Sequence, residues 1–274
     1  MYRYYTIFIF LCGLATGINA QPSHLADSLF AVADYELAAV EYERCVYRAE
    51  TREEVHQALL SKAECYKRLG RYGRAADALG RCATDYGDYL QLALCRYLDR
   101  DFAASSAAAE RCTMLCDSVA EDILLVQMLA LNEQSLFDSA ATVGLRLAEL
   151  HRMATGDDIS LLIDSVFRST PRLKSETLCW YLSLIPGLGH AYAGEYGLGL
   201  AAFAMNAAVL AFGVWQVYAE CYITAWLGGA GLLSVTYPGA MRSAEHYVRK
   251  ANYERVLSFN NSTRRSVMDA LYRR

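Results

Sequence analysis

Proline is the first residue that this chain has little of. It has four prolines among 274 residues, and none lies between Pro22 and Pro171. Proline removes a backbone N–H and clashes with the preceding helical turn, so its absence lets helices run through this stretch. Apolar residues recur there at helical spacing, as in Leu29, Val32 and Leu37. We therefore expect an all-α fold.

Charge is the second absence, and it is confined to one region. Residues 177–241 contain only two charged side chains, Glu195 and Glu220. Soluble domains seldom leave so long a run uncharged, and the rest of the chain is too short to bury it. The apolar segments 197–217 and 221–241 each have about the 20 residues that a helix needs to cross hydrocarbon. We expect a membrane domain at 177–241 that forms a transmembrane helical hairpin.

Catalytic and metal-binding motifs are also missing. No histidine has a second His or a Cys at metal-binding spacing, and the chain contains no Gly-x-Ser-x-Gly, no phosphate-binding glycine loop and no Cys-x-x-Cys. The adjacent pairs Glu53-Glu54 and Asp157-Asp158 do not converge on one point of a helix. We expect neither an enzyme nor a bound cofactor or metal ion.

The charged residues divide the chain by sign. Residues 21–176 carry 17 Lys/Arg and 25 Asp/Glu, a net of −8, whereas residues 242–274 carry eight Lys/Arg and three Asp/Glu, a net of +5. An acidic body disfavours nucleic acid as a partner. The basic helical tail at 242–274 follows the membrane domain, so membrane lipid is its expected counter-charge. Residues 244–257 should form an amphipathic helix on the membrane surface, which the polar run 260–263 ends.

The N-terminus predicts export. Arg3 precedes a largely apolar stretch from Tyr4 to Leu14, and small residues follow as far as Ala20. This order is typical of a signal peptide, here residues 1–20, and an uncleaved signal anchor is the alternative. The expected location is the bacterial inner membrane, with the soluble domain in the periplasm.

A repeated pattern fills residues 21–150. In four segments an aromatic residue is followed three positions later by a small one: Tyr35 and Ala38, Tyr72 and Ala75, Phe102 and Ser105, Phe137 and Ala140. The second segment is the fullest, because Tyr66 and Gly70 precede it. The pattern resembles the tetratricopeptide repeat, whose unit is a pair of antiparallel helices with a period of about 34 residues. The resemblance implies a helical-repeat solenoid whose concave face binds a protein partner, with an inert spacer as the alternative.

Cysteine recurs at one position of this repeat. Ten residues after the first three aromatics come Cys45, Cys82 and Cys112, and Leu147 takes that place in the fourth segment. A cysteine that recurs in this way is explained as a small buried apolar residue. Because the compartment is expected to be oxidising, a disulfide between Cys45 and Cys82 or between Cys82 and Cys112 stays open.

A connector at 151–176, with one short amphipathic helix at 159–167, leads to a glycine motif. The motif residues are Pro186, Gly187, Gly189, Tyr192 and Gly194. They resemble the Pro-Gly-x-Gly-x-x-Tyr-x-Gly motif of small two-span bacterial membrane domains. Pro and Gly should break a helix and let backbones touch, so we expect a re-entrant or interfacial helix against the spans. A bent third span at 178–194 is the alternative, which leaves open the side of the membrane that the tail occupies.

Glycines in the second apolar segment predict a close neighbour. Gly228, Gly229 and Gly231 would let this segment pack tightly, so a homo-oligomer through the spans is a further expectation. Taken together, the sequence predicts a membrane-anchored envelope scaffold or assembly protein that binds a protein partner through its helical repeats. The alternative is that the membrane domain itself acts, in membrane-protein insertion or as an oligomeric channel.

Overall fold

The computed structural model describes residues 22–115 and 120–272 of the chain. These residues form helices and turns and contain no strand, which confirms the all-α prediction. The chain divides between Asp164 and Ser165 into two compact units, here called the repeat unit and the C-terminal unit. The predicted signal peptide and Cys116 lie outside the described residues.

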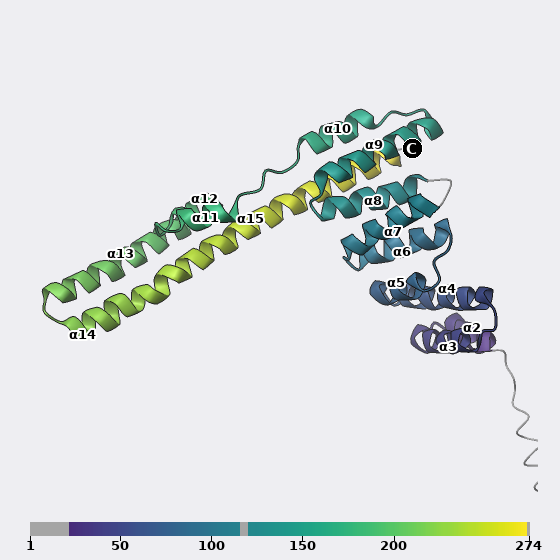
Figure 1. The fold of residues 1–274 in the computed structure, drawn as a ribbon, viewed down its shortest axis with the longest axis horizontal. Coiled ribbons are helices and arrows are strands. Elements are labelled where there is room, and N and C mark those ends of the chain that lie inside the picture. Colours follow the sequence, from purple (N-terminus) through teal and green to yellow (C-terminus); the bar gives the residue numbers. More distant parts are fainter. Residues whose placement is uncertain (1–21, 116–119, 273–274) are drawn as a thin grey trace, which may run out of the picture. The chain divides into compact units, whose positions relative to one another are not determined.

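The repeat unit is built from successive helical pairs. Figure 1 shows each pair as a hairpin, with neighbouring pairs stacked on one another. The pairs are α2 (Pro22–Ala31) with α3 (Tyr35–Arg48), α4 (Arg52–Arg68) with α5 (Tyr72–Gly80), α6 (Tyr86–Leu98) with α7 (Phe102–Leu115), and α8 (Glu121–Glu133) with α9 (Phe137–Thr155). Helix α10 (Ser160–Arg168) follows, at the place predicted for a short helix.

The four hairpins share one turn. The residue two positions before each aromatic has a positive φ, and these residues are Ala33 (63°), Gly70 (69°), Arg100 (66°) and Ser135 (61°). The next residue donates its N–H to the carbonyl five positions back, as from Arg71 to Tyr66 at 2.9 Å. This is the Schellman ending of a helix. The aromatic residue then begins the second helix of the pair.

The small residue of each repeat lies where the two helices of a hairpin meet. Ala38, Ala75, Ser105 and Ala140 are all 0% exposed. The Ser105 hydroxyl donates to the carbonyl of Ala93 on the partner helix at 2.8 Å, so even the polar member of the set is satisfied. The spacing of aromatic and small residues therefore marks the line of closest approach between paired helices.

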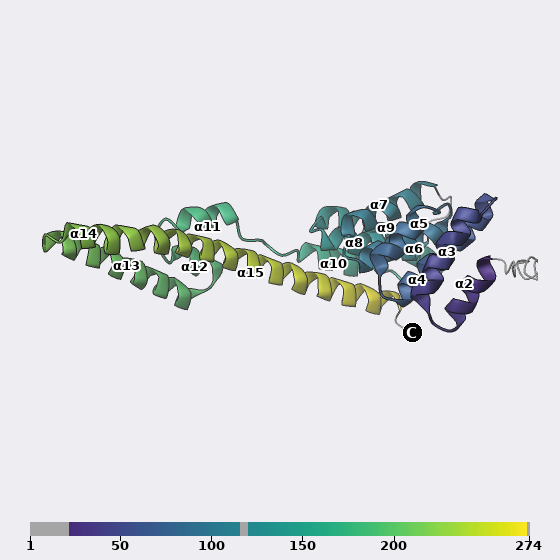
Figure 2. The ribbon, with the colours of Figure 1, turned by 90° about the horizontal axis from the view of Figure 1, so that it is seen from below.

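The C-terminal unit holds the longest helices. Its elements are α11 (Glu176–Leu182), α12 (Leu188–Ala193), α13 (Tyr196–Tyr218), α14 (Tyr222–Thr224), the π-helix η1 (Ala225–Ala230) and α15 (Gly231–Leu271). Helix α13 lies beside η1 and the first part of α15, as Figures 1 and 2 both show. Among the described residues α13 is the one helix long and apolar enough to cross a membrane, by length and composition. The second apolar segment is divided among α14, η1 and α15, and α15 continues into charged sequence.

The tail differs from its prediction. Helix α15 is continuous from Gly231 to Leu271, so the break expected at residues 260–263 is wrong. Phe259 and Val267, on either side of this polar run, are buried, and burial of their apolar side chains outweighs the weak helix propensity of the run. In the tail's first part Tyr253 is 60% exposed and Leu257 is 38% exposed, so the apolar side of this helix is covered only in part. Ala244 and Val248 are buried against α11 and α12.

Candidate functional site

The glycine motif forms the turn between α11 and α12. Pro186 lies in this turn, and Gly187 follows with a φ of 93° at the start of α12. A Cβ on Gly187 would collide with the backbone carbonyl of Gly199 in α13. Gly194 ends α12 with a φ of 107°. Glycines therefore bracket α12 in a left-handed conformation that other residues rarely adopt.

Gly189 lies where α12 crosses two other helices. A Cβ there would collide with the Ser183 hydroxyl at the end of α11 and lie 2.9 Å from the Ala244 Cβ of α15. Around this crossing a small core of buried residues joins the three helices, with the aromatic rings of Tyr192 and Tyr247 packed at its edge; the core residues are Cys179, Ala193, Ala244 and Val248. The motif thus fixes α12 against α11, α13 and α15.

Polar groups in this region pair with one another. His190 Nε2 lies 3.1 Å from Ser243 Oγ, and the Ser183 hydroxyl donates to the carbonyl of Cys179 at 2.8 Å. Between α13 and α15, Thr236 Oγ1 donates to Asn206 Oδ1 at 2.9 Å. The Ser243 hydroxyl therefore gives the buried His190 ring a hydrogen-bond partner within the unit.

Tyr192 and Lys174 attach the segment before α11 to the rest of the unit. The backbone N–H of Ser175 donates to the Tyr192 hydroxyl at 3.0 Å, and Lys174 Nζ donates to the carbonyls of Tyr192 and Ala193 at 2.7 and 2.8 Å. The Asn252 side chain of α15 bonds both the N–H and the carbonyl of Lys174 at 2.8 Å. Burial lowers the pKa of Lys174 from its usual range. This chain segment is therefore firmly fixed to α15.

The glycines of the second apolar segment pack inside the unit. A Cβ on Gly229 would lie 2.6 Å from the Cα of Gly213 in α13, and one on Gly228 would lie 2.9 Å from the Phe212 ring. Beside them an apolar cleft of about 460 Å³ separates α13 from η1 and α15. The close neighbour predicted for Gly228 and Gly229 is therefore α13 of the same chain.

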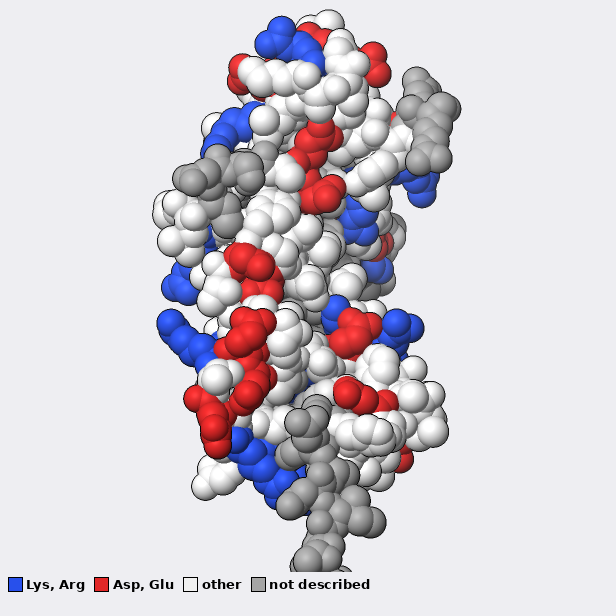
Figure 3. Space-filling model, turned by 90° about the vertical axis from the view of Figure 1, so that its right-hand side faces the viewer, with Lys and Arg blue, Asp and Glu red and all other residues white. Residues whose placement is uncertain are grey.

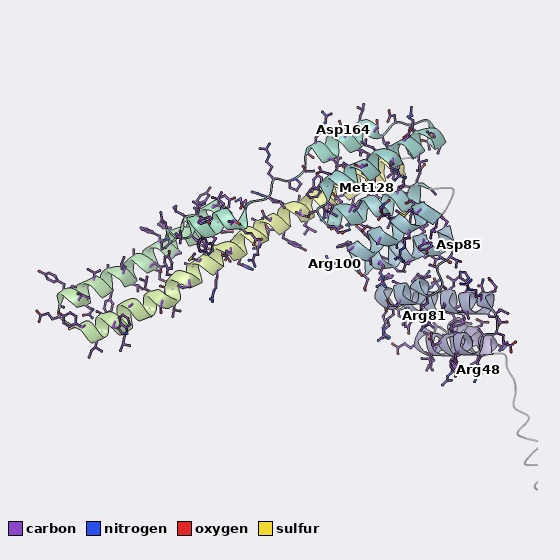
Figure 4. All side chains as sticks on the ribbon, viewed as in Figure 1. Arg48, Arg81, Asp85, Arg100, Met128 and Asp164 are labelled. Carbon is purple, nitrogen blue, oxygen red and sulfur yellow. The ribbon has the colours of Figure 1, made fainter. Side chains whose placement is uncertain are left out.

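The repeat unit carries an open groove between α3 and α4, here called the α3–α4 groove. Its volume is about 560 Å³, and its lining residues are Ala39, Val40, Glu43, Arg44, Tyr47, Arg48, Lys62 and Tyr66. Tyr47 is 91% exposed and Val40 is 50% exposed. Figure 4 labels Arg48 and Arg81 in the N-terminal part of the repeat unit, where this groove lies. Apolar and aromatic surface is thus combined with cations in a unit of net negative charge.

Glu43 is the carboxylate of the α3–α4 groove. It pairs with Lys62 at 2.6 Å and with Arg81 at 2.9 Å. The hydrogen bond from Lys62 does most to lower the pKa of Glu43. Arg74 adds a cation 5.9 Å from the ring centroid of Tyr66. Of the three cations that line this groove, Lys62 pairs with Glu43 and Arg44 pairs with Glu41, so most of the charge at the groove is balanced.

Two histidines of the repeat unit pair with carboxylates that are distant in sequence. His56 Nε2 of α4 lies 2.8 Å from Asp88 Oδ2 of α6, and His151 Nδ1 of α9 lies 3.0 Å from Glu121 Oε2 of α8. The hydrogen bond to Asp88 raises the pKa of His56. Burial alone would raise the pKa of Asp88, but hydrogen bonds from His56 and from the backbone N–H of Thr84 lower it. Sequence reasoning missed both pairs, because no local pattern links residues about 30 positions apart.

Acidic residues occupy the first turns of α4, α6 and α8. Figure 3 shows Asp and Glu side chains following one another along the face of the molecule turned toward the viewer. Carboxylates in a first helical turn complement the helix dipole. This acidic row therefore has a structural explanation.

No disulfide joins the cysteines of the described residues, which are Cys45, Cys65, Cys82, Cys95, Cys112, Cys179 and Cys221. Neither disulfide considered above is present. Burial raises the pKa of Cys65 and of Cys82 to about 11, so both thiols are protonated near neutral pH. Within the described part of the chain no group of His, Cys, Asp and Glu could hold a metal ion. Among the repeat cysteines, Cys82 and Cys112 thus act as small buried residues, whereas Cys45 is partly buried.

The repeat signature and the membrane motif lie in different units. Tyr35, Tyr72, Phe102 and Phe137 begin α3, α5, α7 and α9, and Tyr66 and Gly70 lie at the turn before α5. No protein-family model matches this chain, and no curated protein or solved structure is significantly similar to it. Over residues 22–115 and 120–272 the structure establishes an all-helical arrangement of repeated helical hairpins, with one helix suited by length and composition to crossing a membrane.

Proposed function

We propose that this protein is a membrane-anchored scaffold or assembly protein of the bacterial inner membrane that binds a protein partner through its tetratricopeptide-like repeats. The observation that carries the proposal is the α3–α4 groove. It presents an almost fully exposed Tyr47 beside Arg44, Arg48 and Lys62 on a rigid stack of helices. Exposed aromatic and arginine side chains are enriched where proteins bind one another. Arg44 and Lys62 are paired with Glu41 and Glu43, so Arg48 beside Tyr47 is the cation that we propose to meet an anionic group of the partner.

Helix α13 supports the anchoring part of the proposal. From Tyr196 to Tyr218 it covers roughly 33 Å at 1.5 Å per residue, close to the thickness of a hydrocarbon core of about 30 Å. Tyr196 and Tyr218 are 73% and 90% exposed, as expected for aromatic side chains at the two interfaces. Large apolar side chains between them are also exposed, including Leu200, Phe203, Leu210 and Val214. We propose that η1 and the start of α15 return beside α13 as the second span of a hairpin.

Site-specific photocrosslinking tests partner binding. A benzophenone amino acid replaces Tyr47 in the full-length protein, expressed in its native cells, and the control places it at Glu110, which is exposed on α7. We expect a discrete crosslinked partner from position 47 and none from position 110. Arg48→Glu should weaken that crosslink at least several-fold. Equal products from both positions, or none from position 47, would contradict the proposal.

An anchor exchange separates this proposal from direct action by the membrane domain. Residues 177–241 are replaced by an unrelated two-span hairpin, and the cellular phenotype of the deletion strain is scored. The scaffold proposal expects the chimaera to restore function. If only the natural anchor works, and Gly187→Leu in the natural anchor also abolishes function while the protein remains in the membrane, the membrane domain itself acts in insertion or as an oligomeric channel.

A further inference from the structure

Helices α11 and α12 form a hairpin that runs along α13 and α15 and returns. At its tip, Gly187 packs against Gly199, and a Cβ on Gly187 would lie 3.3 Å from the Phe203 Cβ. The carbonyl of Leu184 near the tip accepts from the Tyr237 hydroxyl at 2.7 Å. At the open end, Glu176 pairs with Arg249 at 2.9 Å. The tip and the open end therefore lie at different levels along α15.

The positions of the hairpin tip and of its open end along the long helices follow from the helical rise of about 1.5 Å per residue. Phe203 lies seven residues inside the start of α13 at Tyr196, which is roughly 10 Å along the helix axis. The tip of the hairpin thus lies beside the part of α13 that would be in hydrocarbon, whereas its open end lies beside the charged part of α15. Helices α11 and α12 have seven and six residues. Each is about 10 Å long, far too short to cross a core of about 30 Å.

The outer side of the hairpin tip is apolar and open. Leu184, Ile185 and Leu188 are 49%, 55% and 43% exposed. The surface of α13 at the same level is equally apolar, since Leu200 and Phe203 are 70% and 52% exposed. The exposed surface of the tip is therefore continuous with the surface that the spanning helix would present to lipid.

The backbone of the tip is suited to a medium without water. The N–H groups of Ile185 and Leu188 donate to the carbonyls of Leu182 and Ile185 at 3.2 and 3.1 Å, and the N–H of Ala191 donates to the carbonyl of Gly187 at 3.0 Å. An irregular backbone is tolerated at membrane depth when its polar groups are satisfied and it packs against protein. The tip packs against α13 and α15, and the N–H groups named above are satisfied.

We infer that the α11–α12 hairpin is a re-entrant element that enters one leaflet and returns, with lipid hydrocarbon as the partner of Leu184, Ile185 and Leu188. The inference rests on the proposed anchoring through α13. It replaces a third crossing at residues 178–194, and it places the segment before α11 and the basic tail on the same side of the membrane. The turn that contains Cys221 then lies on the opposite side.

Spin labelling tests the lipid contact. The full-length protein, with Cys12, Cys45, Cys116 and Cys221 replaced by Ser, carries a nitroxide at Ile185→Cys in vesicles of phosphatidylethanolamine and phosphatidylglycerol. Matched labels at Leu200→Cys and Asn261→Cys serve as references for lipid and water. We expect the label at 185 to collide with oxygen more than with a water-soluble nickel chelate, as at 200. Collision with the chelate as at 261, or an immobile label reached by neither reagent, would overturn the inference.

The two references separate this inference from the anchoring proposal. A water-exposed label at 200 would refute the anchor itself, whereas a lipid-exposed label at 200 with a water-exposed or covered label at 185 refutes only the re-entrant hairpin. A membrane-impermeant maleimide gives a second readout on sealed vesicles. Native Cys221 and a cysteine at 261 should react from opposite sides. Reaction from the same side would mean that the chain does not cross the membrane between them, and it would overturn the two-span anchor on which the inference rests.

Discussion

Exchanging glycine and alanine between two equivalent turns tests the hairpin geometry of the repeat unit. Gly70 and Ala33 occupy the same left-handed position, with φ of 69° and 63°. A residue with a Cβ costs roughly 1–2 kcal/mol in this conformation. Replacing glycine also reduces the entropy of the unfolded chain, which offsets about 0.4–1 kcal/mol. A Cβ on Gly70 would meet no atom within 4 Å, so no steric clash adds to the destabilisation expected for Gly70→Ala.

The expected free-energy changes follow from these figures. Gly70→Ala should lower the free energy of unfolding by about 0.5–1 kcal/mol, and Ala33→Gly should raise it by about the same amount. The double exchange should leave the stability nearly unchanged, because the two turns belong to different hairpins. Thermal unfolding of the full-length protein in detergent, followed by circular dichroism, measures these changes. A difference of 1 kcal/mol moves Tm by about 2–4 °C for a domain of this size.

Gly80 provides the matched control for this exchange. It lies at the end of α5, in helical conformation, and a Cβ there would also meet no atom within 4 Å. Gly80→Ala should therefore stabilise the protein by up to about 1 kcal/mol through helix propensity. Gly70 and Gly80 differ in backbone conformation, so the two substitutions should change the free energy of unfolding in opposite directions. If Gly70→Ala stabilises as Gly80→Ala does, the left-handed turn at Gly70 is refuted.

Three further predictions concern ionisation, packing and thiol burial. His56→Ala should cost about 1–2 kcal/mol of unfolding free energy near pH 6 and less near pH 8. The reason is that the hydrogen bond to Asp88 raises the folded-state pKa of His56 above its ordinary 6.5. The stability that the His56–Asp88 pair contributes is therefore fully present below pH 6.5 and is lost as the pH rises through the folded-state pKa. Gly189→Ala should destabilise the C-terminal unit by about 1–3 kcal/mol, because its Cβ has no room. Cys221 should react with a thiol reagent in the folded protein, whereas Cys65 should react only after unfolding.

Each of these predictions has its own control. A stability loss for His56→Ala that does not change between pH 6 and pH 8 would refute the ion pair with Asp88. Gly197→Ala is the control for Gly189, because a Cβ there meets no atom within 4 Å, and it should be tolerated. The stability of both variants is measured by unfolding in detergent. An equal loss of stability for Gly189→Ala and Gly197→Ala would contradict the packing described here. Rapid labelling of Cys65 under native conditions would contradict its burial.

The repeat unit was largely predictable because its signals are local. An aromatic residue and a small residue three positions apart lie on one helical face, so their recurrence predicts paired helices wherever it occurs. The left-handed turn was recognisable only at Gly70. At Ala33, Arg100 and Ser135 the same turn is made by residues that give no such signal, because the packing of the two helices imposes the conformation.

For the C-terminal unit, the sequence predicted the apolar character of the segments better than the boundaries of the helices. The uncharged run and its glycines indicated a membrane element, and Gly187, Gly189 and Gly194 do form close approaches and turns. The polar run at residues 260–263 indicated a helix end, yet α15 continues through it. Local propensities there amount to a few tenths of a kcal/mol per residue, and burial of the apolar side chains of Phe259 and Val267 exceeds them.

The amino-acid sequence by itself determined the all-helical class, the period of the hairpins and the apolar character of α13, because periodicity, proline placement and charge act over a few residues. Only the tertiary structure decided that His56 meets Asp88, that Gly213 and Gly229 meet within one chain, and that α11 and α12 fold back against α13 and α15. These contacts join residues that are 12 to 69 positions apart. Their geometry follows from how whole helices pack, which no local pattern specifies.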